Sequence, residues 1–202
     1  MPDPRNVAIL IFDEVEVLDF AGPFEVFSVT GRSRDVKPFS VYAVAEHRRP
    51  VLARNGLSIN PAFGLHDCPR PDLLVIPGGW GTRAAMNNAP LVEWIRRAAT
   101  GAELVLSVCT GALLLAKAGL LDNLPATTHH GQFDLLAQTA PTATVVRDER
   151  FVDTGRVVTS GGISAGIDAS LHVVARLLGN PAARDAAEYM EYRWPPPGSA
   201  SA

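Results

Sequence analysis

The chain of 202 residues has few cysteines, no long apolar run and no strong excess of charge of either sign. Its two cysteines, Cys68 and Cys109, form neither a disulfide framework nor a Cys-x-x-Cys site, so we expect reduced thiols in a cytoplasmic protein. The first apolar run, Val7 to Phe12, is too short for a signal peptide or a membrane span. A formal net charge of -3 gives no electrostatic reason to expect nucleic acid or an anionic membrane as a partner.

Motifs for common cofactors and metals are also missing. The glycines are too few and wrongly spaced for either common nucleotide-binding fingerprint. Two neighbouring histidines, His129 and His130, lack the helical offset that would place both imidazoles on one metal ion. The sequence therefore predicts neither a metal nor a cofactor.

The composition is typical of one globular domain with a sizeable core, since 47% of the residues are hydrophobic and 19% are charged. We expect this domain to span residues 1–194 and a flexible Pro/Ser/Ala tail to occupy residues 195–202. Short apolar strands alternate with helices, which predicts an α/β fold with a mostly parallel sheet and helices on both faces. Strands are expected at 7–12, 39–45, 73–76 and 126–128, a hairpin at 151–159, and helices at 19–29, 90–100, 132–138, 165–178 and 181–192.

The clearest chemical signal is the stretch from Glu103 to Ala116. A strand-like apolar run reaches Cys109 and continues through Thr110 and Gly111 into an Ala/Leu run typical of a helix. That order predicts a sharp turn that places the sulfur at the top of a sheet, near a helix N-terminus that favours the thiolate. The alternative is a buried structural cysteine, because cysteine is among the most commonly buried residues.

Other polar or glycine residues also follow predicted strands. Ligands of open α/β sheets bind beyond the carboxyl ends of the strands, so we expect these segments to converge on one rim. They are Asp19, Gly78 with Gly79, Cys109, His129, and the turn 161–164.

Asp19 is the preferred proton partner for Cys109. Two anions in a partly desolvated site repel each other, so the pair should share one proton near neutral pH. Three alternatives remain: Asp19 caps a helix, the glycine pairs form tight turns only, and His129 is a loop residue. In a functional site, the glycine amides would stabilise negative charge that develops on a substrate.

Five segments together resemble the DJ-1/PfpI superfamily of class I glutamine amidotransferase-like proteins, and most of all its isonitrile hydratase branch. They are VEVLDFAGP at 15–23, IPGG at 76–79, SVCTGA at 107–112, ATTH at 126–129 and GGISAGID at 161–168, within a match from Val7 to about Tyr192. The resemblance implies a flavodoxin-like three-layer sandwich, usually a homodimer, with the cysteine at a strand-to-helix nucleophile elbow.

The hydratase resemblance implies a cofactor-independent hydro-lyase that adds water to a small isonitrile and releases an N-substituted formamide. Cys109 would attack the terminal carbon, Asp19 would deliver the proton, and water would hydrolyse the resulting thioimidate. Thr110 would orient Asp19 or water. The remaining candidate contacts to the substrate or intermediate are Gly78, Gly79, Gly161, Gly162 and Ile163. Trp80 and His129 are secondary candidates. Trp80 and Ile163 would form the wall of a pocket for the R group.

Two other functions remain open. Relatives proposed as proteases or glyoxalase/deglycase enzymes commonly carry histidine after the cysteine and glutamate at the carboxylate position, where this chain has Thr110 and Asp19. The same pattern also resembles the ligand-sensing half of AraC-type regulators, which continue into a helix-turn-helix domain where this sequence stops. A cysteine-based stress or ligand sensor and a glyoxalase or deglycase are therefore the alternatives to the hydratase.

Overall fold

The computed structural model describes residues 3–194, so the tail expected at 195–202 lies outside the described residues. The strands are β1 (Arg5–Leu10), β2 (Phe39–Ala45), β3 (Val51–Leu52), β4 (Ser58–Ile59), β5 (Phe63–Gly64), β6 (Leu73–Ile76), β7 (Leu104–Val108), β8 (Pro125–Ala126), β9 (Thr144–Val145), β10 (Phe151–Asp153) and β11 (Val157–Ser160). The α-helices are α1 (Val17–Val29), α2 (Thr82–Ala85), α3 (Ala89–Gly101), α4 (Gly111–Lys117), α5 (Phe133–Thr139), α6 (Ala165–Leu178) and α7 (Asn180–Tyr189). Short 3-10 turns are η1 (Arg32–Arg34), η2 (Arg54–Gly56) and η3 (His130–Gln132).

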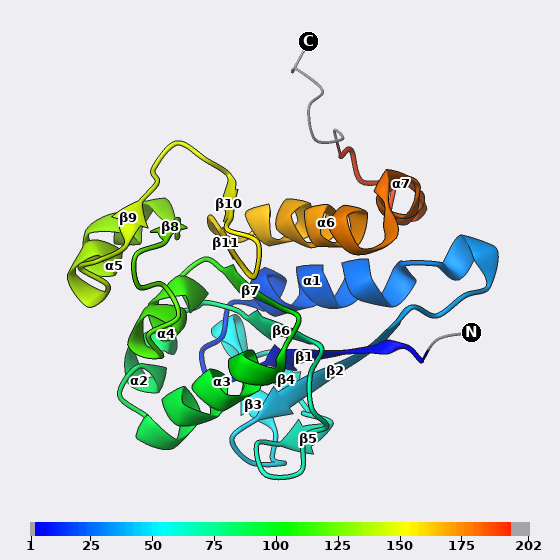
Figure 1. The fold of residues 1–202 in the computed structure, drawn as a ribbon. Helices are drawn as coiled ribbons and strands as arrows, with labels where there is room; N and C mark the ends of the chain where they lie inside the picture. Colours follow the sequence, from blue (N-terminus) through cyan, green and yellow to red (C-terminus); the bar gives the residue numbers. More distant parts are fainter. Residues whose placement is uncertain (1–2, 195–202) are drawn as a thin grey trace.

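A seven-stranded sheet in the order β10-β11-β7-β6-β1-β2-β5 forms the centre of the molecule (Figure 1). Every neighbouring pair is parallel except β10 and β11, which form the predicted hairpin. Helices α1, α6 and α7 cover one face, while α2, α3 and α4 cover the other (Figure 1). The predicted three-layer α/β sandwich is therefore confirmed.

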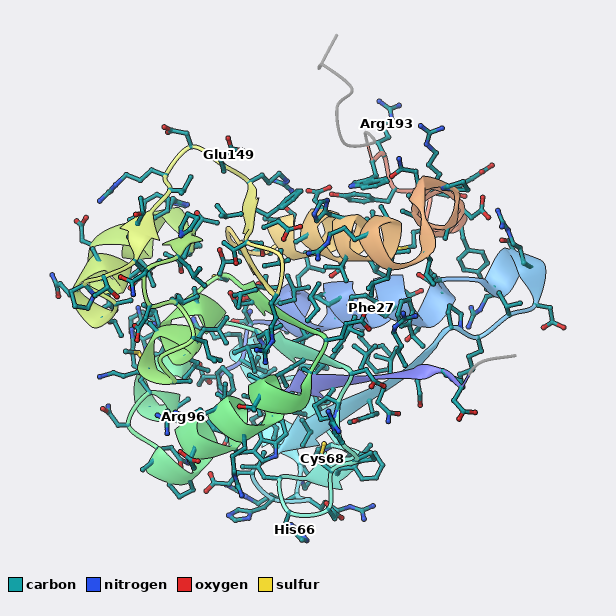
Figure 2. The ribbon with its side chains drawn as sticks, viewed as in Figure 1. Phe27, His66, Cys68, Arg96, Glu149 and Arg193 are labelled. Carbon is teal, nitrogen blue, oxygen red and sulfur yellow. The ribbon has the colours of Figure 1, made fainter. Side chains whose placement is uncertain are left out.

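The hydrophobic cores on the two faces of the sheet follow from the alternation of side chains along each strand. On β1, Val7 and Ile9 pack toward the helices of one face, and Ala8 and Leu10 toward those of the other. Phe27 of α1, labelled in Figure 2, is buried in the first of these cores. Because both faces of β1 are covered, its sequence is a continuous apolar run rather than an alternating one.

Most predicted elements agree with the structure, but the start of α1 differs. The helix begins at Val17, so Pro23 lies inside it rather than in its first turn. Since proline has no N–H, the Asp19 carbonyl cannot receive the usual helical bond from that position. The strand expected at 126–128 is also shorter, because β8 ends at Ala126.

Within residues 3–194, no helix combines the length and the apolarity that a membrane crossing requires.

Candidate active site

Cys109 lies between the end of β7 and the start of α4, with a φ of 57° in the left-handed region that non-glycine residues rarely adopt. Its amide donates to the carbonyls of Gly161 at 3.0 Å and Ser160 at 3.2 Å. The Thr128 hydroxyl donates to its carbonyl at 2.7 Å. Hydrogen bonds to two other segments thus hold Cys109 in a strained backbone conformation. Strained residues held in this way cluster at functional sites.

Two glycines allow the loop after β6 to approach this turn closely. A Cβ on Gly78 would lie 2.5 Å from the Thr110 amide nitrogen, and a Cβ on Gly111 would lie 2.0 Å from the Ile76 carbonyl oxygen. Real Cβ atoms do not come this close, so both positions require glycine. The glycines therefore bring the 78–79 backbone against the cysteine turn.

Asp19 is fully buried on α1 and faces this loop. The Gly78 amide donates to its Oδ2 at 3.0 Å, while its Oδ1 is buried with no hydrogen-bond partner among the described residues. Glu16, not Asp19, occupies the N-cap position of α1. The capping alternative is therefore wrong, because the Asp19 carboxyl group accepts a bond from another segment and not from its own helix.

The pKa values of Asp19 and Cys109 are both raised. Burial raises the pKa of Asp19 to about 7, and the nearby Glu16 adds to this, against the opposing effects of the Gly78 amide and the Cys109 side chain. Burial and then the charge of Asp19 raise the pKa of the Cys109 thiol to about 12. The helix N-terminus therefore does not give the resting protein a low-pKa thiol, contrary to the sequence prediction. At neutral pH the two groups together hold at least one proton.

The Thr110 hydroxyl is a junction between the cysteine turn and the 79–82 loop. It accepts from the Gly79 amide at 2.9 Å and lies 2.9 Å from the Thr82 hydroxyl. Thr82 in turn donates to the Gly79 carbonyl at 2.8 Å. In the described part of the chain these bonds tie Thr110 to the loop, and none joins its hydroxyl to Asp19.

A cavity of about 230 Å³ opens above Cys109. It brings together several residues named from the sequence, including Trp80 and Ile163, which are exposed by 60% and 41%. Ile163 also has a positive φ of 56°. The complete lining is Glu16, Arg54, Gly79, Trp80, Arg83, Cys109, Thr110, His129, Gln132 and Ile163.

His129 belongs to this lining rather than to a remote loop. Its Nδ1 accepts from the Gly131 amide at 3.1 Å at the start of η3. Burial and then the neighbouring His130 lower its pKa, which favours the neutral imidazole. A Cβ on Gly162 would lie 2.4 Å from the His129 ring, so glycine is needed there for the two segments to meet.

The sequence prediction missed four charged or polar residues of the cavity: Glu16, Arg54, Arg83 and Gln132. Glu16 lies three residues before Asp19, and Arg83 lies three residues after Trp80. This closeness in sequence to predicted site residues was the only signal that could have identified them. Arg54 and Gln132 come from segments without a motif, and only the folded chain places them here.

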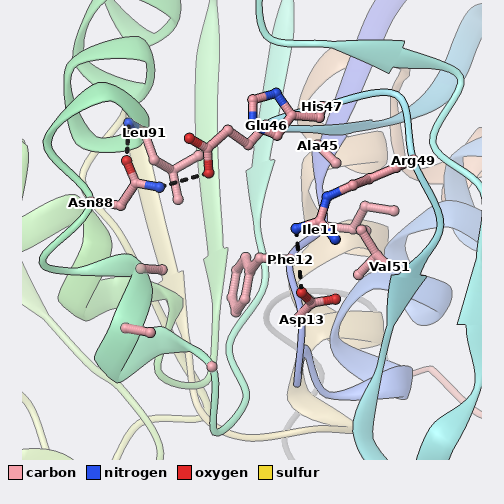
Figure 3. A pocket seen from close by; sticks show the side chains of 13 residues that line it. Ile11, Phe12, Asp13, Ala45, Glu46, His47, Arg49, Val51, Asn88 and Leu91 are labelled. Carbon is pink, nitrogen blue, oxygen red and sulfur yellow. Dashed lines mark hydrogen bonds and ion pairs between the residues drawn. The ribbon is translucent and has the colours of Figure 1, made fainter.

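A second cavity, of about 170 Å³, lies beside the 79–82 loop (Figure 3). Figure 3 shows Asn88 donating to Glu46 at 2.7 Å and Arg49 near Asp13 at 3.9 Å, around an apolar wall that includes Phe12. None of the site residues named from the sequence lines it. Of the residues named from the sequence, six line the cavity above Cys109 and four are absent from its lining. Those in the lining are Gly79, Trp80, Cys109, Thr110, His129 and Ile163, and those outside it are Asp19, Gly78, Gly161 and Gly162.

Across residues 3–194, the side chains of His, Cys, Asp and Glu form no group of three that could hold a metal ion.

The fold and the site define a class of protein: a parallel α/β sandwich with a cysteine at a strand-to-helix turn, paired with a buried carboxyl group. The model of the DJ-1/PfpI family matches residues 5–176, and the chain belongs to this family.

Individual relatives differ in what their names say. The chain is 36% identical to isonitrile hydratase from Pseudomonas putida over 192 residues, which cover 95% of this chain and 80% of that protein. It is 31% identical to the HTH-type transcriptional regulator CdhR from Pseudomonas aeruginosa over 164 residues, or 76% of this chain and 48% of the regulator. The chain thus spans about half the length of that relative.

Solved structures share the fold of this chain. A THiJ/PfpI family protein from Pseudomonas syringae superposes with a TM-score of 0.85 at 30% identity, covering 100% of this chain and 86% of that one. DJ-1beta from Drosophila melanogaster has the same fold, with a TM-score of 0.81 at 20% identity over 95% of this chain and 100% of that one.

Proposed function

We propose that the protein is a cofactor-independent isonitrile hydratase that acts on a small-molecule substrate. The observation that carries this proposal is Cys109 in the lining of an open cavity, paired with the buried Asp19, both with raised pKa values. The 36% identity to isonitrile hydratase from Pseudomonas putida supports the same reaction.

The chemistry suits the pair because the terminal carbon of an isonitrile accepts both a nucleophile and a proton. In the first step the Cys109 sulfur bonds to that carbon and a proton held by the pair passes through Asp19 to the same carbon. The product is a thioimidate, R–N=CH–S. Water then adds to its carbon, and one proton of the water passes to the nitrogen. The C–S bond breaks, the other proton returns to the Cys109–Asp19 pair, and the formamide R–NH–CHO leaves.

Backbone groups around the pair would stabilise the intermediates. The Thr110 and Ile163 amides lower the pKa of Cys109, which means that they favour negative charge on its sulfur. Gly79 also lines the cavity, but its amide already donates to the Thr110 hydroxyl, so it positions Thr110 rather than binding the intermediate. In this proposal, Gly161 and Gly162 hold the turn that presents the Ile163 amide, and the side chains of Trp80 and Ile163 contact the R group. In this proposal, His129, which lines the cavity and whose lowered pKa favours the neutral imidazole, orders the attacking water.

The test is to incubate the purified protein with a small alkyl isonitrile and to measure formamide formation. Cys109→Ala and Asp19→Ala should each abolish turnover, while Cys68→Ala, which removes the cysteine outside the cavity, should retain it. Robust turnover by either of the first two variants would exclude this mechanism. Absence of turnover by the wild type with a panel of isonitriles would exclude the activity.

A second candidate is a ligand or stress sensor, and the match to the regulator CdhR favours it. A sensor should form a reversible oxidised species at Cys109 at low peroxide and show no isonitrile turnover. Titration with peroxide followed by intact-mass analysis measures this directly.

The family resemblance also supports a homodimer as the assembled form. Light scattering coupled to size-exclusion chromatography measures the mass in solution. A mass near twice that of the 21.5 kDa chain is the expected result, and a mass near that of one chain would exclude the dimer.

A further inference from the structure

Arg83 is a cation in the lining of the Cys109 cavity that the proposed reaction does not use. Its guanidinium lies over the Trp80 ring at 4.0 Å from the ring centre. It also donates to Gln132 Oε1 at 3.4 Å. The side chain is therefore held in place on two sides, by residues that line the same cavity.

These contacts leave most of the hydrogen-bonding capacity of Arg83 free. A guanidinium has five N–H donors, and one of them has a described protein acceptor. Among residues 3–194, no carboxylate lies within ion-pairing distance of Arg83. A preorganised guanidinium with a free edge fits a carboxylate, which it binds through two parallel hydrogen bonds.

Within residues 3–194, the other charged residues of the lining neither pair with Arg83 nor offer a second free cation. Arg54 already pairs with Glu14 at 2.5 Å. The charge of Glu16 raises the pKa of Asp19, and Glu16 forms no ion pair with Arg83 among the described residues. Arg83 is thus the cation of the described lining that remains available to an anionic ligand.

We propose that the substrate carries a carboxylate on its R group and that Arg83 binds it, so that small isonitrile carboxylates are the preferred substrate class. This inference rests on the proposed hydratase function. The isonitrile carbon lies at Cys109 and the carboxylate at Arg83, which orients the substrate along the cavity. Hydration of such a substrate gives an N-formyl amino acid.

The experiment compares isocyanoacetate with its uncharged methyl ester. The measured quantity is the ratio of kcat/KM for the carboxylate to that for the ester, in the wild type and in variants. Arg83→Met should lower this ratio at least tenfold, roughly the effect of losing one charge-assisted hydrogen bond. Arg83→Lys should recover part of it. The control Arg97→Met removes an equal charge from an exposed site on α3 and should leave the ratio unchanged.

A second measurement separates this inference from the reaction itself. Calorimetry measures binding of N-formylglycine, the product, and of its methyl ester. The free acid should bind more tightly to the wild type, and Arg83→Met should remove that preference.

The outcomes are distinct. If both isonitriles are turned over, and the ratio of kcat/KM for the carboxylate to that for the ester is the same in the wild type and Arg83→Met, the inference is overturned. The hydratase proposal then still stands. Absence of turnover of both isonitriles refutes the hydratase proposal, and the binding measurement then decides the carboxylate site alone. Equal binding of acid and ester to the wild type would overturn that site.

Discussion

Replacing Asp19 with asparagine should change how the stability of the protein depends on pH. The carboxyl group has a pKa of about 7 in the folded protein against a usual value of 3.8. Because the folded state holds this proton more tightly than the unfolded state does, Asp19 lowers the free energy of unfolding as pH rises from about 4 to about 7. A shift of about 3 pKa units corresponds to roughly 4 kcal/mol across that window. Asparagine does not titrate, so Asp19→Asn loses this dependence.

Urea unfolding at about pH 5 and about pH 8 measures the effect. Relative to Asp19→Asn, the wild type should lose roughly 2.5 kcal/mol between these two values, since most of the titration falls between them. Asp148→Asn, which makes the same charge change in an exposed segment, should follow the wild type. Parallel pH dependences for the wild type and Asp19→Asn would refute the argument that burial raises the Asp19 pKa.

Two further predictions concern the same site. Thr110→Val leaves the Gly79 amide and the Thr82 hydroxyl without their shared partner, and should lower the free energy of unfolding in urea by about 1–3 kcal/mol. Thr110→Ser, which keeps the hydroxyl, should retain most of the stability. Equal stabilities of the two variants would contradict the role of the hydroxyl. Asp19→Asn should also speed the reaction of Cys109 with iodoacetamide at about pH 8, because the charge of Asp19 raises the thiol pKa. Mass spectrometry of the alkylated peptide measures the rate, and a slower reaction in the variant would reverse the assigned sign.

The sequence was sufficient to predict the layered α/β architecture and that Asp19 and Cys109 lie close together. Continuous apolar runs such as 73–76 identify strands buried on both faces, and the rule that ligands bind beyond strand ends places Asp19 and Cys109 together. The structure has both residues at the loop after β6, with Gly78 contacting Asp19.

What the sequence could not give depends on burial and on contacts between distant segments. A cysteine before a helix suggests a low-pKa thiol, but the desolvation of Cys109 and the neighbouring Asp19 outweigh the helix N-terminus. Neither quantity can be read from local sequence. Arg54 and Gln132 could not be predicted for the same reason, because contacts between distant segments of the folded chain bring them to the cavity.

The central claim is that the Cys109 sulfur bonds to the isonitrile carbon during turnover. Rapid acid quenching of the protein with an isonitrile, followed by peptide mass spectrometry, tests it directly. We expect an adduct on the Cys109 peptide with the mass of the whole isonitrile, formed before the formamide and absent from Cys109→Ser. Formamide production by Cys109→Ser at the wild-type rate, with no adduct on the wild type, would contradict it.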